Sequence, residues 1–98
     1  MSNLTDTRGR DYGHPRDQFA CAEGMYAIWQ ARRQDAIERR GEEVDAEEES
    51  ALRHVMHMFC TKMSRAAHNP KKADTWHDFK GYADCYMDAC GIDEAEEL

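Results

Sequence analysis

The chain has 98 residues, which suit one small domain with a modest core. Hydrophobic residues make up 41% of it and charged residues 34%, a balance typical of a globular protein and not of a disordered one. Acidic residues outnumber basic ones by 20 to 13. The resulting net charge of −7 argues against general binding to nucleic acid, because phosphate neutralisation requires clustered Lys and Arg.

The sequence has no sign of a membrane span or a secretion signal. No stretch approaches the roughly 20 apolar residues that a spanning helix needs, and residues 1–10 lack an apolar signal core. We therefore expect a cytoplasmic protein without membrane contact. The four cysteines form no C-x-x-C pair, so we expect reduced thiols, with a disulfide between helices as the alternative; they are Cys21, Cys60, Cys85 and Cys90.

The first predicted helix follows a flexible arm at residues 1–10 and a turn at Gly13-His14-Pro15. Proline suits the first turn of a helix, so the helix should run from about Arg16 to Arg40, where Gly41 ends it. Three- and four-residue spacing predicts an apolar stripe along it. The stripe comprises Phe19, Ala22, Met25, Tyr26, Ile28 and Trp29.

The second predicted helix spans about Ala46 to Ala67, after an acidic connection. Asp45 is positioned to cap it, and the glutamates at 47–49 suit a solvated first turn near the positive end of the helix dipole. One face of the helix is apolar and carries Leu52, Val55, Met56, Phe59, Met63 and Ala66. The opposite side carries His54, His57, Thr61 and Arg65, and Lys62 lies at the margin of the apolar stripe.

The third predicted helix begins near Asp74, a plausible cap, after a break at His68-Asn69-Pro70, and runs to about Cys90. Its expected buried face comprises Trp76, Phe79, Ala83, Met87 and Cys90. Residues 92–98 form an acidic, frayed tail after Gly91. With no strand pattern, the sequence predicts a compact all-α domain over residues 11–91. We expect three helices with antiparallel neighbours, completed by oligomerisation because the domain is small.

Polar residues gather around the predicted corner between the second and third helices, from Lys62 to Tyr82. Lys62 and Arg65 lie three residues apart, and a partly desolvated lysine there could face a phosphate or a carboxylate. Alternatively, both cations complement the negative end of the second helix. We expect Lys62, Arg65 and Tyr82 to contact a ligand.

Asp74 and Asp78 are four residues apart and share a helical face, so they could jointly hold Mg²⁺ through oxygen ligands. The alternative is that Asp74 caps the helix and Asp78 pairs with Lys62 or Arg65. His54, His57 and Cys60 offer zinc-ligand chemistry, but no fourth ligand is evident, so we expect these histidines to face solvent or a partner.

Residues 12–15 form a second short motif, Tyr-Gly-His-Pro. Proline launches the helix and His14 is presented at its N-terminus, where free backbone N–H groups and the helix dipole favour an anion. His14 is therefore a candidate phosphate contact. The alternative is a plain turn that enters the helix.

The combination resembles a small domain of unknown function that is common in bacteriophage genomes. The resemblance runs from about Arg8 to Cys90. It rests on D-Y-G-H-P at 11–15, Phe19, Trp29, K-x-x-R at 62–65, Asn-Pro at 69–70 and D-x-W-x-D-x-x-G-Y-A at 74–83. It implies a phage or prophage origin, hence the cytoplasm of a host cell, and an all-helical fold.

A more distant likeness is to the MazG-like all-α nucleotide pyrophosphatases. It implies a Mg²⁺-dependent nucleotide site between helices in an oligomer, with Asp74 and Asp78 in the acidic role and Lys62 and Arg65 in the phosphate role. Those enzymes also use a pair of glutamates from earlier helices. The inward faces of the first two helices here carry no such pair, since Glu23 stands alone, so multi-metal hydrolysis is left open.

Three hypotheses follow. In the first, a phage accessory protein binds a nucleotide or another phosphorylated small molecule at the Lys62–Tyr82 corner. In the second, an acidic phage inhibitor mimics phosphate and binds a host protein such as a defence factor, using residues 42–49, Asp84, Asp88 and the acidic tail at 93–97. In the third, Lys62, Arg65, Asp74 and Asp78 neutralise one another and only fix the corner between the helices.

Overall fold

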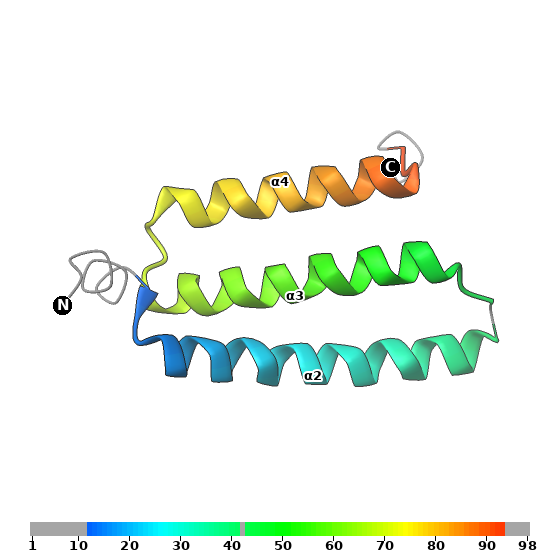
Figure 1. Cartoon of the computed structure of the whole chain (residues 1–98), viewed down its shortest axis with the longest axis horizontal. Coiled ribbons are helices and arrows are strands. Elements are labelled where there is room, and N and C mark those ends of the chain that lie inside the picture. Colours follow the sequence, from blue (N-terminus) through cyan, green and yellow to red (C-terminus); the bar gives the residue numbers. More distant parts are fainter. Residues whose placement is uncertain (1–11, 42, 94–98) are drawn as a thin grey trace.

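The computed structural model describes residues 12–41 and 43–93, and its regular elements in these ranges are three α-helices. They are α2 (Pro15–Arg40), α3 (Ala46–His68) and α4 (Ala73–Cys90). Figure 1 shows them as three antiparallel rods joined by short connections. The expected all-α fold is confirmed, and each predicted boundary is within one residue of the observed one. The expected arm at 1–10 and residues 94–98 of the acidic tail lie outside the described residues.

The helix ends follow the expected capping chemistry except at the start of α4. Asp45 Oδ1 accepts a hydrogen bond from the Glu48 N–H at 2.9 Å, and Gly41 and Gly91 end their helices with positive φ of 64° and 65°, the left-handed conformation that glycine adopts at little cost. The prediction that Asp74 caps α4 is wrong. Lys72 occupies the N-cap position, so Asp74 lies inside the first turn, where its charge still suits the helix dipole.

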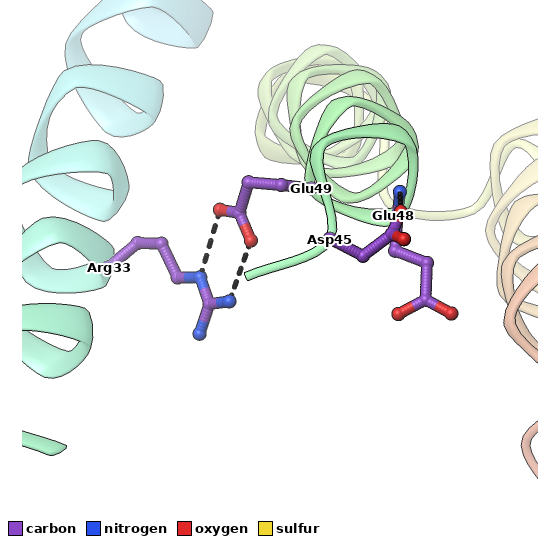
Figure 2. Close-up of polar contacts among 4 residues, drawn as sticks. All are labelled: Arg33, Asp45, Glu48 and Glu49. Atoms are coloured by element: carbon purple, nitrogen blue, oxygen red, sulfur yellow. Dashed lines mark hydrogen bonds and ion pairs between the residues drawn. The ribbon is translucent and has the colours of Figure 1, made fainter. Parts of the chain in front are cut away.

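Helix α3 lies between the other two helices. Figures 1 and 2 both show α2 on one side of α3 and α4 on the other. Within the described ranges, α2 packs on α3 and α3 packs on α4, but α2 and α4 do not pack on each other. The helices therefore form a single layer in which α3 is the shared neighbour.

This layer buries few apolar side chains. Among residues 12–41 and 43–93, only Ala22, Val55 and Cys60 are buried hydrophobic residues. Several side chains expected in the core are exposed, including Phe19 at 60%, Met63 at 42% and Trp76 at 48%. The physical reason is the single-layer arrangement. In one layer, neighbouring helices cover only the sides of a helix that face them, so part of each predicted apolar stripe has no packing partner.

A bidentate ion pair fastens α2 to α3 near their connection. Arg33 donates from Nε to Glu49 Oε2 at 3.0 Å and from one terminal nitrogen to Glu49 Oε1 at 2.7 Å (Figure 2). Glu49 is buried, so its expected place in a solvated first turn is wrong; Glu47 and Glu48 are exposed as expected. The hydrogen bonds from Arg33 hold the pKa of Glu49 below its ordinary value, despite an opposing effect of burial.

Other polar contacts continue this seam toward the start of α2. The Ser64 hydroxyl donates to the Gln18 carbonyl at 3.1 Å. His57, on the side of α3 that we expected to face solvent, pairs with Glu23, and its ring lies 4.6 Å from that of Tyr26. Glu23 is therefore not isolated. The α2–α3 contact thus combines polar and apolar side chains along its length.

The pair of Arg33 and Glu49 gives α2–α3 packing a pH dependence. Because the pKa of Glu49 is lower in the folded state, the ion pair stabilises the fold in full at pH values above the pKa of the unfolded state, about 4.3. This stabilisation is lost as the pH falls through the pKa of the folded state.

We expect Glu49→Gln to lower the free energy of unfolding at pH 7 by about 1–2 kcal/mol, since Arg33 is partly exposed. The difference from wild type should shrink toward pH 3 in urea titrations. Glu47→Gln, in the same turn but exposed, is the control; equal effects of both changes at pH 7 would contradict the assignment.

The four cysteines, all within the described chain, are free thiols. Cys60 is 1% exposed, and burial raises its pKa, so little of it is thiolate near neutral pH. Cys85 is exposed. We expect iodoacetamide to modify Cys85 in the folded protein well before Cys60, and both at similar rates in urea, as followed by mass spectrometry of peptides. Modification of Cys60 as fast as Cys85 under native conditions would show that α2 does not cover it.

Candidate anion site

The predicted corner contains an ion pair whose cation is buried. Lys62 is only 6% exposed, and its Nζ lies 2.7 Å from Asp78 Oδ2. Its stem follows the margin of the apolar stripe of α3, as the sequence indicates, while the ammonium reaches across to α4. Asp78 is half-exposed. The hydrogen bond from Lys62 lowers its pKa, with smaller help from the nearby charges of Lys62, Arg65 and His77, so Asp78 is ionised at neutral pH.

Arg65 lies one helical turn beyond Lys62 and stacks on an aromatic ring. Its guanidinium carbon is 4.8 Å from the centre of the Tyr12 ring, within the range of a cation–π contact. The Nε–H of Arg65 is buried and has no acceptor among the described residues. Lys62 and Arg65 thus bring two positive charges close to the single carboxylate of Asp78, which leaves this corner locally positive in a protein of net charge −7.

The remaining predicted site residues are arranged differently. His14 is the N-cap of α2, where its Nδ1 accepts a hydrogen bond from the Arg16 N–H at 3.1 Å, so the helix-entry alternative describes its observed contact. Asp74 is exposed. In the part of the chain that the structure describes, no hydrogen bond or ion pair joins His14 or Asp74 to Lys62 or Arg65. Tyr82 is half-buried and lines a shallow hollow of about 260 Å³ together with Asp78.

The described side chains do not assemble a metal centre. No three His, Cys, Asp or Glu side chains in residues 12–41 and 43–93 lie close enough to hold a metal ion together. Asp74 and Asp78 share a face of α4, but one oxygen of Asp78 already accepts from Lys62. These two aspartates therefore offer few free oxygen ligands to a Mg²⁺ ion, whose coordination demands several of them.

Sequence reasoning did not find the cavity that adjoins this corner. About 350 Å³ in volume, it is bounded by the turn at residues 12–14, the first turns of α2 and the end of α3, and its lining includes Tyr12, His14, Gln18, Ser64 and His68. The Gln18 side chain is buried, and its Nε2 has no partner within the described chain. Gln18 sits inside the apolar stripe of α2, so no sequence signal marked it.

Glycine at position 13 is required by this turn. Its φ is +86°, and a Cβ atom there would lie 3.2 Å from Nδ1 of His68. Both the backbone conformation and the close approach of the imidazole therefore favour glycine. The Tyr-Gly-His-Pro motif thus has a structural meaning: Gly13 allows the turn to approach α3, which positions Tyr12 under Arg65.

No helix in the described ranges is long and apolar enough to cross a membrane. Neither the curated proteins nor the solved structures include a significant match to this chain. One family model does match, that of the Domain of unknown function (DUF6378), over residues 2–90. The match covers the turn at residues 12–14, all three helices and the corner between α3 and α4, and it agrees with the expected likeness to a domain of unknown function. The chain therefore belongs to the DUF6378 family.

Proposed function

We propose that this domain binds a small phosphorylated ligand, a nucleotide in the first instance, at the corner formed by Lys62, Arg65 and Asp78. Two observations carry the proposal together. The buried Nε–H of Arg65 lacks an acceptor, and the neighbouring Lys62 pairs with Asp78, the one carboxylate that balances both cations. Leaving a buried donor unpaired costs about 1–3 kcal/mol. A phosphate oxygen would provide the missing acceptor and balance the second positive charge.

The contacts of Arg65 suit a preorganised anion contact. Its planar guanidinium can donate two parallel hydrogen bonds to a phosphate, and stacking on Tyr12 restricts its orientation before the ligand arrives. Tyr12 also lines the cavity of about 350 Å³, a size within the range of small-molecule sites. The phosphate would therefore lie at Arg65 and Lys62, with the rest of the ligand near Tyr12.

The nucleotide class, a phage origin and a link to MazG-like pyrophosphatases come from the sequence resemblance. Phosphate-bound Mg²⁺ could enter with the ligand, where Asp74 or the free oxygen of Asp78 would be its nearest carboxylates on α4. Because these two aspartates supply fewer oxygen ligands than multi-metal hydrolysis uses, we propose binding as the function and treat cleavage as a separate measurement.

Titration calorimetry and thermal-shift measurements test this proposal with nucleoside triphosphates and inorganic pyrophosphate, each with and without Mg²⁺. We expect at least one of them to bind, and Arg65→Gln and Lys62→Met to weaken that binding about tenfold or more, equivalent to about 1.4 kcal/mol. Released pyrophosphate or phosphate, measured in the same samples, reports hydrolysis independently of binding.

Matched controls are available on the same helices. Arg53→Gln removes an exposed arginine of α3 about 18 Å from Arg65 along the helix axis, and Lys80→Met removes an exposed lysine of α4. Both should bind like wild type. The proposal fails if no probe stabilises the wild-type protein, or if the controls lose as much affinity as the corner variants.

A second candidate, an acidic inhibitor of a host protein, is favoured by one observation. The exposed carboxylates of Glu43, Glu47 and Glu48 lie around the connection between α2 and α3, at the opposite end of the layer from Lys62 (Figure 1). Such a cluster could contact a basic surface. A salt-sensitive, stoichiometric host partner that is lost on Glu47→Gln with Glu48→Gln, but retained in Arg65→Gln, would support this function over ligand binding.

A further inference from the structure

One side of the helical layer is apolar and has no partner within the described chain. Helix α3 contacts α2 through Glu49, Cys60 and Ser64 and contacts α4 through Phe59 and Lys62. Successive residues of a helix are rotated by about 100°. On one side of α3, all the positions between the side that faces α2 and the side that faces α4 are apolar. They are Leu52, Met56 and Met63, and Phe59 lies at the edge toward α4.

An aromatic row extends this surface from α3 onto α4. The rings of Phe59 and Phe79 are 5.6 Å apart, and those of Phe79 and Trp76 are 5.5 Å apart. Met87 follows Trp76 on the same side of α4, three turns along, and Met25 continues the surface onto α2 by the same helical geometry. We call this set the open apolar face. It comprises Met25, Leu52, Met56, Phe59, Met63, Trp76, Phe79 and Met87.

The open apolar face has the size and composition of a protein interface. The helices are 26, 23 and 18 residues long. At about 1.5 Å per residue and about 8–10 Å between axes, the whole layer has a footprint of roughly 800 Å² on this side, comparable with the surface that each partner buries in a standard interface. Methionine and aromatic residues dominate it, as they do in interface cores. Met63 at its centre is 42% exposed and Trp76 is 48% exposed, and the other six side chains of the face are half-buried.

The occupant must be able to cover this whole face. Of the residues outside the described ranges, 1–11 contribute only Met1 and Leu4 as large apolar side chains and 94–98 only Leu98, too few to cover eight side chains. A second copy supplies an equal area with no charged group in its centre, so two faces meet without repulsion. Stacking two layers also gives the two-layer architecture around a shared core that stable domains use.

We infer that two copies of this chain pack their open apolar faces together to form a two-layer dimer of six helices. The contact is isologous, so the same side chains serve both partners. The opposite side of α3 carries His54, Thr61 and Arg65 and stays outside the dimer. Assembly therefore leaves the Lys62–Asp78 ion pair outside the dimer contact.

Light scattering after size exclusion and sedimentation velocity test the dimer. We expect wild type at twice the chain mass of 11.3 kDa and Met63→Glu at the chain mass, because a charge at the centre of the face would be desolvated in the dimer. Met58→Glu is the matched control, since it makes the same change in the same helix on the opposite side. It should remain dimeric.

A second measurement covers the case in which Met63→Glu fails to fold. Folding coupled to dimer formation makes the Tm of the wild-type protein rise with concentration, from about 1 µM to about 100 µM. A folded wild-type monomer, a Tm independent of concentration, or a dimer retained by Met63→Glu would each overturn the inference. A wild-type monomer that folds only with a different protein on this face would overturn it as well.

Discussion

The structure depends on the fact that α3 alone contacts both other helices. Two of its sides face neighbouring helices. One side contacts α2 through Glu49, Cys60 and Ser64, and another contacts α4 through Phe59 and Lys62. Two sides remain, and the sequence makes them chemically opposite. One bears His54, Thr61 and Arg65, and the other bears Leu52, Met56 and Met63. In a closed three-helix bundle, α2 and α4 would also pack on each other, and one of these sides of α3 would be buried beneath them. Because α2 and α4 do not pack on each other within the described chain, both sides are available for other interactions.

Polar contacts fix the geometry of this layer more than they stabilise it. The pairs Arg33–Glu49 and Lys62–Asp78 join α3 to its two neighbours. A buried ion pair gains little net free energy, because desolvation offsets the attraction, but breaking one partner leaves a costly unpaired charge. The two pairs therefore select the register in which α2 and α4 lie along α3. The larger favourable term must come from apolar burial, at about 25 cal/mol per Å², and three buried hydrophobic side chains in the described ranges supply little of it.

Much of the fold could be predicted from the sequence because helix limits are set locally. Pro15, Asp45, Gly41 and Gly91 act through neighbouring backbone groups, so their roles follow from the sequence itself. Helical periodicity likewise identified the apolar sides of α3 and α4, but it could not show what covers them, and Trp76 and Met63 were wrongly expected in a core. The pair of Arg33 and Glu49 joins residues 16 apart on two helices, a contact that depends on how the helices pack. For Asp78 the sequence narrowed the partner to Lys62 or Arg65, and only the packing of α4 on α3 selected Lys62.

An anion at the proposed site of Lys62, Arg65 and Asp78 would have to bind against the charge of the whole chain. A net charge of −7 repels anions at long range, but at physiological salt exposed charges are screened beyond about 8 Å. Local groups therefore decide whether a phosphate binds, and locally two cations face one carboxylate. In the proposed site, Asp78 would compete with the ligand for Lys62. Asp78 pairs with the buried ammonium, and because its side chain is half-exposed, it could turn toward water if a phosphate oxygen took its place. Under the proposed function, such an exchange would keep the buried lysine paired with and without ligand.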